Sequence, residues 1–256
     1  ARTQMIWDSP WGSGFPGWHI ECSAMSIDFL DAVVDIHVGG IDLRFPHHEN
    51  ERAQSNSLTG QEVVKTWVHG EHLLFEGRKM SKSAGNVVLL GDLIERGLDP
   101  LALRFALLEN RYRSQMDLSW SSLEAAHSTL RRWRKLMCDW GTSTELKIDT
   151  EITDSLTNDL DTPRAMQRLR TLEKDLTIGA LDKRAIFLYA DQVLGLALDR
   201  APEEKPLSEE LQQLLKAREV ARTEKNWAES DSLRNQLESA GLEINDGAQG
   251  QSWSWK

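Results

Sequence analysis

Residues 76–86 read Glu76-Gly77-Arg78-Lys79-Met80-Ser81-Lys82-Ser83-Ala84-Gly85-Asn86. This segment places three cationic side chains and two hydroxyls between two glycines. Glycine lets a backbone approach a ligand closely, and lysines are mobile point charges that suit a polyphosphate. Serine hydroxyls and backbone N–H groups can complete such an anion site. The segment therefore predicts a phosphate-binding loop, with an ordinary solvated loop as the alternative that composition alone leaves open.

Short apolar runs interrupted by glycine and proline surround this loop. The segments 32–36 and 71–75 are typical of short buried strands, and they alternate with stretches of helical character. After about residue 120, glycine and proline become sparse and the pattern is helical. The sequence therefore predicts an α/β domain over residues 1–118, an all-α helical bundle over 119–200 and a small unit over 207–256.

Local signals predict where several elements begin and end. Ser119 is a candidate N-cap, with Glu124 closing a capping box, and Asp161-Thr162-Pro163 places a cap before an early proline. A helix pair is expected from about residue 208 to 239, followed by a turn at Asn245-Asp246-Gly247. A last unit of about 50 residues is small for independent stability, so we expect it to dock on the bundle or on a partner.

The composition limits the classes of partner. The 256 residues include 30 basic and 40 acidic side chains, a net charge of −10. This balance argues against a generic polyanion binder with a basic surface, although it does not exclude a local basic face. No run of about 18 apolar residues is present, so no transmembrane helix and no membrane partner are expected. Residues 1–4 carry neither an initiator methionine nor a signal-peptide pattern, which suggests a processed chain or an excised piece.

The chain contains two cysteines, Cys22 and Cys138. Nothing else in the sequence suggests a secreted protein, so both are expected to be reduced thiols and the protein to be cytoplasmic. Cys138 lies in an apolar helical stretch, which favours a small packed side chain.

Cys22, His47 and Glu51 are side chains of the metal-ligand type. His47 and Glu51 are four residues apart, so on a helix they share a face and can bind one ion together. Thiolate, imidazole and carboxylate together suit Zn²⁺ better than Ca²⁺ or Mg²⁺. The spacing therefore predicts a zinc site, with a buried cysteine beside a solvated histidine and glutamate as the alternative.

Several strings occur together in one order along the chain. Lys79-Met80-Ser81-Lys82-Ser83 is the second signature of class I aminoacyl-tRNA synthetases, and the whole chain resembles a cysteinyl-tRNA synthetase. The other strings that carry this resemblance are Ser9-Pro10-Trp11-Gly12, Gly17-Trp18-His19-Ile20-Glu21-Cys22-Ser23-Ala24-Met25, Gly39-Gly40-Ile41-Asp42-Leu43, Phe45-Pro46-His47-His48-Glu49-Asn50-Glu51, Tyr112-Arg113-Ser114-Gln115, Leu160-Asp161-Thr162-Pro163-Arg164-Ala165, Ala217-Arg218, Ala221-Arg222, Trp227-Ala228, Ser230-Asp231 and Trp253.

The resemblance begins part-way through the family pattern. A His-x-Gly-His string, the first class I signature, is absent from the 256 residues. The N-terminal cysteine that supplies the family's fourth zinc ligand is absent as well. The chain resembles roughly the C-terminal three-fifths of a synthetase, which implies the C-terminal part of a Rossmann catalytic domain whose activity depends on an N-terminal half.

The resemblance implies a reaction in two steps. Cysteine and ATP give cysteinyl adenylate and pyrophosphate, and the tRNA 3′ end then takes the cysteinyl group. It also implies one Zn²⁺ per chain, held by Cys22, His47 and Glu51, with the substrate thiolate as a further ligand. Zinc prefers a thiolate to a hydroxyl, so serine would be rejected by bond chemistry. Trp18 would wall the amino-acid pocket, and His19 and His37 would join a histidine cluster at its base. His48 is expected to be a neighbour of the metal ligands because it points off the face shared by His47 and Glu51.

The resemblance also assigns residues to ATP, which the family uses with Mg²⁺ as a substrate. Gly39, Gly40 and Asp42 match the family's adenosine-binding loop, where Asp42 would accept hydrogen bonds from ribose hydroxyls. Lys79 and Lys82 would act as catalytic residues that stabilise charge on the leaving pyrophosphate. Taken alone, a Gly-Gly-x-Asp string is more often a simple turn than a binding site.

The last 50 or so residues match the part of the family that contacts the anticodon of tRNA(Cys). An arginine pair four residues apart with a nearby tryptophan suits unpaired bases, which need stacking and hydrogen-bonding groups. An ordinary solvated helix face remains the alternative for each residue. The residues that the resemblance assigns to the anticodon are Arg218, Arg222, Trp227, Asp231 and Asp246.

Two other functions fit parts of the sequence. A related ligase joins cysteine to an amino sugar in mycothiol synthesis and shares the zinc and lysine-loop elements, but it lacks a comparable anticodon unit. The segment 208–256 therefore favours the tRNA enzyme. The other alternative is a truncated, non-catalytic paralogue that binds tRNA, zinc or a partner; the intact Lys79–Ser83 string argues against it.

Overall fold

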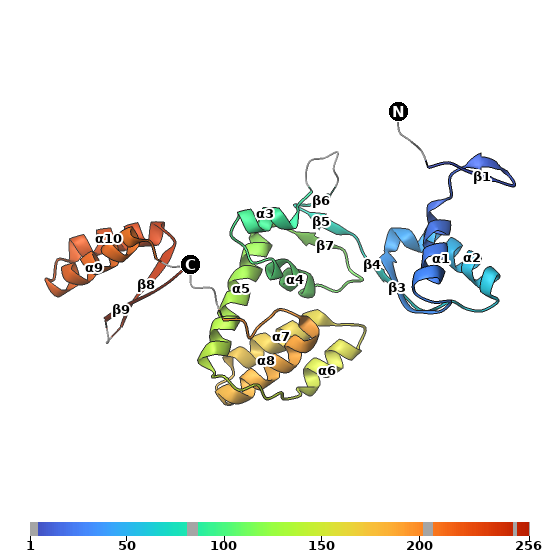
Figure 1. The fold of residues 1–256 in the computed structure, drawn as a ribbon. Helices are drawn as coiled ribbons and strands as arrows, with labels where there is room; N and C mark the ends of the chain where they lie inside the picture. The colour runs from blue at the N-terminus through green and yellow to red at the C-terminus, as the bar shows by residue number, and fades with distance from the viewer. Residues whose placement is uncertain (1–4, 81–86, 202–206, 248–249, 256) are drawn as a thin grey trace.

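A computed structural model describes residues 5–80, 87–201, 207–247 and 250–255. Lys82 and the two serines beside it in the signature string therefore lie outside the described residues. The chain forms α/β elements first and then a helical bundle, as predicted, and ends in a small unit of two helices and a hairpin (Figure 1).

The first part of the chain is built around a parallel strand pair. Strands β3 and β4 pair from Val34↔Val64 to Gly40↔Gly70 and are connected through α2. Their carboxyl ends therefore meet at one edge, the usual position for a ligand site in an open α/β sheet. The elements of this part are β1 (Trp7–Ser9), β2 (Gly12–Gly14), α1 (Trp18–Phe29), β3 (Val34–Gly40), η1 (Ile41–Leu43), η2 (Arg44–His48), α2 (Glu49–Thr59) and β4 (Val64–Gly70).

The buried strand predicted at 32–36 is only partly right. Strand β3 begins at Val34, but its side chains Ile36 and Val38 are 61% and 65% exposed. Both side chains lie on one face of β3 because they are two residues apart. No element among the described residues covers that face.

A second sheet connects the first part to the bundle. Its strands are ordered β6-β5-β7, with β5 parallel to β7 and antiparallel to β6. Phe75 and Leu118 of this sheet belong to the same buried cluster as the helices that follow. The elements are β5 (Leu73–Phe75), β6 (Arg78–Lys79), α3 (Leu90–Glu95), α4 (Leu101–Leu108) and β7 (Met116–Leu118).

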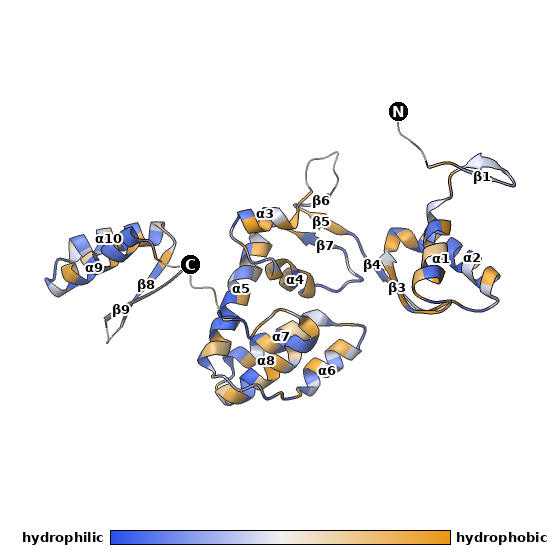
Figure 2. Cartoon of the chain, viewed as in Figure 1, coloured by the Kyte–Doolittle hydropathy of each residue, from blue (hydrophilic) through white to orange (hydrophobic). Residues whose placement is uncertain are grey.

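The bundle holds the main hydrophobic core. Trp133, Phe105 and Phe187 are fully buried, and their rings contact one another with centroid distances of 5.2 and 5.3 Å around Trp133. Hydropathy colouring shows many apolar residues on α4 and α8 (Figure 2). The bundle helices are α5 (Trp120–Asp139), α6 (Thr150–Thr157), α7 (Thr162–Lys174) and α8 (Ala180–Leu194).

Three local predictions in the bundle need correction. Ser119 is the N-cap of α5 as predicted, but Ser122 closes its capping box instead of Glu124. Asp161 precedes α7, yet its carboxylate makes no cap and pairs with Arg111. Cys138 is exposed, so it is not the packed apolar side chain that was expected.

The last described residues form a unit with its own small core. Leu215, Leu237, Leu242 and Ile244 make a buried cluster between two helices and an antiparallel hairpin. The predicted helix pair is present, but the turn predicted at 245–247 is wrong because those residues continue a strand. The elements are α9 (Glu209–Thr223), α10 (Trp227–Ser239), β8 (Leu242–Gly247) and β9 (Gly250–Trp255).

Within the described ranges, every helix is too short or too polar to cross a bilayer.

Candidate functional site

The three predicted metal ligands come together. The ligand atoms of Cys22, His47 and Glu51 all lie within 4.8 Å of one another. Cys22 is carried by α1, Glu51 by the first turn of α2, and His47 by the turn just before α2. The backbone is helical from His48 onward, so the spacing of four residues still brings His47 and Glu51 to one side.

The carboxylate of Glu51 decides whether a cation suits this cluster. One oxygen, Oε2, lies 3.2 Å from Nε2 of His37. The other, Oε1, is buried, lies beside Nε2 of His47 and makes no hydrogen bond. A buried carboxylate oxygen without a donor is costly, and a bound cation would satisfy it. The donor set of sulfur, nitrogen and oxygen therefore fits Zn²⁺.

The electrostatics around the cluster agree with this assignment. Burial raises the pKa of the Glu51 carboxyl, and burial together with Glu51 and Glu21 raises the pKa of the Cys22 thiol. Burial also lowers the pKa of His47. Each shift disfavours a charged side chain in the absence of a counter-charge, and a divalent cation supplies that counter-charge.

A residue that the sequence analysis did not single out fixes the helix that carries Cys22. Ser23 is buried and donates a hydrogen bond from Oγ to Oε1 of Gln54, 2.9 Å away on α2. The same hydroxyl also lies 3.0 Å from the carbonyl of His19. This contact ties α1 to α2 next to the ligand atoms. Its only sequence signal was a serine beside a cysteine, which is too common to be informative.

The histidine cluster includes His48 and His69 in addition to the histidines predicted to form it. His48 is buried, and its Nδ1 lies 2.9 Å from Nε2 of His69 on β4. Burial and the neighbouring histidines lower the pKa of His48 to about 4, so its ring is neutral at pH 7. His48 also forms a second group of ligand-type atoms with His37 and Glu51. His48 thus neighbours the proposed ligands Cys22, His47 and Glu51 without belonging to their group, and its role stays a prediction.

Gly39 is required by the position of His48. A Cβ at Gly39 would lie 2.5 Å from Cε1 and 2.8 Å from Nε2 of the His48 ring. Gly40 is similar, because a Cβ there would lie 2.4 Å from Oδ1 of Asp42. The glycines predicted to admit a nucleotide thus admit two side chains of the protein itself, at the carboxyl end of β3.

Gly39→Ala should therefore destabilise the protein by about 1–3 kcal/mol, the usual cost of overpacking a filled site. Gly91→Ala is the matched control, because nothing lies within 4 Å of a Cβ at that helical glycine. The control should be neutral or stabilising, by up to about 1 kcal/mol. Urea unfolding of both variants measures the difference, and equal stabilities would contradict the packing described here.

The other predicted pocket residues lie close to the metal ligands. The ring centroids of Trp18 and His47 are 4.4 Å apart, and those of His19 and His47 are 6.1 Å apart. Trp18 remains 62% exposed, so it is accessible to a ligand. Lys79 is exposed in β6, a separate part of the fold from these rings.

A cavity of about 550 Å³ opens beside the histidine cluster. Trp67, His48 and His69 contribute rings to its wall, and Arg113 and Arg44 contribute positive charge. Neither Gly39, Gly40, Asp42 nor Lys79 lines it.

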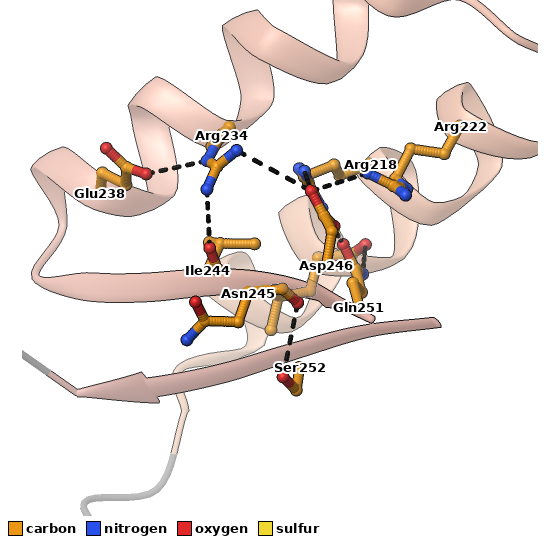
Figure 3. A network of polar contacts seen from close by, with 10 residues as sticks. Arg218, Arg222, Arg234, Glu238, Ile244, Asn245, Asp246, Gln251 and Ser252 are labelled. Carbon is orange, nitrogen blue, oxygen red and sulfur yellow. Dashed lines mark hydrogen bonds and ion pairs between the residues drawn. The ribbon is translucent and has the colours of Figure 1, made fainter. Parts of the chain in front are cut away.

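Two of the residues predicted to contact an anticodon pair with each other. Arg218 is 1% exposed and donates to both carboxylate oxygens of Asp246, at 3.0 and 2.9 Å, and to Oε1 of Gln251 at 2.7 Å. Arg222 lies 2.8 Å from the same carboxylate, and Arg234 approaches it to 3.8 Å (Figure 3). Arg218 thus has no surface to offer an RNA base, and its position is that of a structural residue.

The remaining predicted contacts lie on the surface of this unit. Trp227 is 59% exposed at the first turn of α10, and Asp231 follows four residues later on the same helix. Arg222 is about one-third exposed. These three side chains are available to a partner.

Comparison with known families identifies the chain. Residues 1–128 match the family described as tRNA synthetases class I (C) catalytic domain, and residues 204–253 match the cysteinyl-tRNA ligase anticodon binding domain. The chain belongs to the cysteine–tRNA ligase family. The resemblance drawn from the sequence motifs is thereby confirmed.

Curated cysteine–tRNA ligases match the chain over nearly its whole length. Relatives from Methylocella silvestris, Burkholderia lata and Brachyspira hyodysenteriae are 44%, 41% and 37% identical, over 100%, 98% and 98% of this chain. The matched part is 57%, 54% and 58% of those ligases, so the chain spans just over half of their length.

A solved synthetase shares the fold. The agnB2 LeuRS of Agrobacterium radiobacter K84, in a ternary complex with tRNA and LeuAMS, superposes with a TM-score of 0.56 at 15% identity. The match covers 75% of this chain and 32% of that LeuRS. It supports the class I architecture predicted for the catalytic part.

Proposed function

We propose that the chain supplies the zinc-binding and tRNA-binding parts of a cysteine–tRNA ligase. The observation that carries this proposal is the convergence of Cys22, His47 and Glu51, with one buried Glu51 oxygen lacking a hydrogen bond. The predicted substrates are cysteine and ATP with Mg²⁺, and the predicted acceptor is tRNA(Cys). One Zn²⁺ per chain is the predicted metal.

Separate residues of this chain would bind the metal and bound the amino-acid pocket. Cys22, His47 and Glu51 would hold Zn²⁺, which when bound supplies a cation that favours a thiolate over a hydroxyl and so distinguishes cysteine from serine. His37 orients Glu51 through its 3.2 Å contact. Trp18, with its exposed face beside His47, would bound the amino-acid pocket.

The chemical step would join the amino acid to the nucleotide. A carboxylate oxygen of cysteine attacks the α-phosphorus of ATP, an adenylate bond forms, and pyrophosphate leaves with the electron pair of the broken bond. Lys79 and Lys82 are proposed to stabilise the negative charge on the leaving group. Asp42 is proposed to accept hydrogen bonds from ribose hydroxyls. Its carboxylate folds back over Gly40, which places it at the carboxyl end of β3.

The C-terminal unit is proposed to bind the anticodon. Trp227 offers an exposed ring for stacking, and Arg222 and Asp231 offer hydrogen-bonding groups to base edges. The match of residues 204–253 to an anticodon binding domain supports this role and favours the tRNA enzyme over a ligase for an amino sugar. The network around Asp246 would hold the surface in place.

The test is ATP–pyrophosphate exchange that depends on cysteine. The assay uses this chain alone and with the remaining N-terminal portion of the Methylocella silvestris relative, supplied as a second polypeptide. Because the chain lacks the His-x-Gly-His signature, we expect exchange only when both are present. A pairing that binds zinc stoichiometrically but shows no exchange would overturn the catalytic proposal. It would instead favour the non-catalytic alternative.

A further inference from the structure

The turn between α6 and α7 has an unusual backbone. Asp159 and Leu160 both have φ of 53°, in the left-handed region that non-glycine residues rarely adopt. The side chain of Leu160 is 52% exposed, so burial of this residue does not explain the conformation. Two successive left-handed residues are costly and persist only when surrounding contacts hold them.

Three consecutive residues from another part of the chain supply those contacts. Arg113 donates to both carboxylate oxygens of Asp159, from Nε at 2.7 Å and from Nη2 at 3.2 Å. The Tyr112 hydroxyl donates to Oδ1 of Asp159 at 2.6 Å. Arg111 pairs with the buried Asp161. The turn and the segment 111–113 are therefore fastened together by one bidentate pair, one hydroxyl bond and a second ion pair.

The segment 111–113 is also fastened to the wall of the 550 Å³ cavity. The backbone N–H of Glu71 donates to the carbonyl of Tyr112 at 2.7 Å, directly after β4 ends. Glu71 and Arg113 both line the cavity. The strained turn is thus connected to the cavity through Arg113. The carboxylate of Asp159, which does not line the cavity, sets the direction of the Arg113 guanidinium.

The cavity has the properties of a site for unpaired nucleotides. Its wall includes the rings of Trp67 and His69 and the edge of the buried His48 ring, whose Nδ1 lies 2.9 Å from Nε2 of His69. The carboxylates of Glu49 and Glu71 lie in the same wall. Arg113 and Arg44 add positive charge at the same wall, and Arg44 has no ion pair in the part of the chain that the structure describes. Rings combined with arginines are the usual means of binding single-stranded nucleic acid.

We propose that Asp159 is a positioning residue that aims Arg113 at a backbone phosphate of the unpaired 3′ end of tRNA in this cavity. The proposal rests on the proposed function for its ligand. Among the described residues assigned to ATP, none of Gly39, Gly40, Asp42 and Lys79 lines the cavity, and the ring of Trp67 beside Arg113 and Arg44 suits an unpaired polynucleotide end. The bundle and the cavity would then be set in one orientation by the turn at 158–161.

The experiment is a double-mutant cycle on the 256-residue chain. The variants are Asp159→Asn, Arg113→Gln and both together. The probes are a minihelix with the acceptor stem and its unpaired 3′ end, and the anticodon stem-loop alone. Asparagine tolerates the left-handed conformation, so Asp159→Asn should keep the turn. Asp154→Asn is the matched control. Asp154 is exposed on α6, and its substitution removes the same charge as Asp159→Asn.

A positioning role and general electrostatics predict opposite changes in RNA affinity for Asp159→Asn. Removal of an acidic side chain should by itself strengthen RNA binding slightly, and Asp154→Asn should do this or nothing. Asp159→Asn should instead weaken minihelix binding about 5- to 10-fold, as should Arg113→Gln, with no further loss in the double variant. The slope of log K against log salt should fall by about 0.7 in each, because one phosphate contact is lost. The anticodon stem-loop should bind all variants equally.

Failure of this inference differs from failure of the proposed function. A chain that binds neither RNA overturns the tRNA role itself. A chain that binds the minihelix, but in which Asp159→Asn binds as well as the wild type, overturns the positioning role. The positioning role is also overturned if Asp159→Asn weakens minihelix binding as much in the Arg113→Gln background as in the wild type. Asp159 would then act without Arg113. Asp159→Gly, which relieves the strain and also lacks the carboxylate, should behave like Asp159→Asn and so guards against a folding artefact.

Discussion

A chain in which serine replaces Cys22 should bind zinc at least about 100-fold more weakly than the wild type. Loss of an outer residue that only orients a ligand already costs about 10- to 100-fold in metal affinity, and Cys22 is proposed as a ligand itself. A serine hydroxyl is a poor substitute because it stays protonated at neutral pH, whereas zinc is bound by the thiolate. Competition with a chromogenic chelator, together with elemental analysis of the purified chain, measures the loss.

Cys138→Ser is the matched control for this change. Cys138 is an exposed free thiol on α5, remote in sequence from the cluster, and its loss should leave zinc binding unaltered. Cobalt substitution gives a second readout, because a thiolate ligand produces a charge-transfer band that should vanish only in Cys22→Ser. Zinc retained at full stoichiometry and affinity in Cys22→Ser would refute the assignment of the metal site.

Asp246→Asn should destabilise the C-terminal unit by about 3 kcal/mol. Removal of one partner from a buried ion pair leaves the other charge buried and uncompensated. Here that charge is the guanidinium of Arg218, which is 1% exposed and whose Nε already lacks a hydrogen bond. A unit of about 50 residues has little stability in reserve, so a loss of this size should unfold it. Hydrogen exchange of peptides from β8 and α9 reports this unit separately from the bundle.

Arg222→Gln tests the same network at its exposed edge. Arg222 contacts the same Asp246 carboxylate at 2.8 Å, but its side chain is 32% exposed. An exposed pair contributes at most about 1 kcal/mol, so hydrogen exchange in β8 should change little. If Arg222→Gln destabilises the unit as much as Asp246→Asn does, the burial of Arg218 is not the cause of the destabilisation.

The pH dependence of this unit follows from the same pair. The hydrogen bond from Arg218 holds the pKa of the Asp246 carboxyl below its usual range. In the unfolded chain this carboxyl takes up its proton near pH 4, while in the folded unit it remains ionised to lower pH. Its stabilising contribution is therefore complete above about pH 4 and is lost as the pH falls through the folded pKa. The Asp246→Asn variant should lose this part of the acid sensitivity.

The chemistry of the metal site was available in the sequence because it depends on residue types and short spacing. Cysteine, histidine and glutamate are residue types that can bind zinc, and His47 and Glu51 converge through one helical turn. The class I family and the order of α/β part, bundle and terminal unit also followed from local strings and periodicity. Helix positions in the terminal unit were predicted for the same reason, since they reflect patterns a few residues long.

Other features depended on which distant segments meet, and these the sequence left open. Whether Arg218 contacts RNA or a protein carboxylate depends on how β8 packs on α9, since the two partners are 28 residues apart. Glu124 lies five residues after Ser119, too far along the helix to close the capping box, and Ser122 at the third helical position closes it instead. His48 turned inward because His69 lies opposite it on β4, and Gly39 is needed only once His48 is there. The link from Asp159 to Arg113 joins residues 46 positions apart.

By itself, then, the sequence determined the family, the residues of the proposed zinc site and the helical parts of this protein. Each of these is a property of residue identity and local spacing, which a linear chain carries directly. Only the tertiary structure decided which charged side chains are buried in pairs and which remain free for a ligand. The physical reason is that burial and partner choice arise when segments remote in sequence pack together, and the energy of a charge depends on that packing.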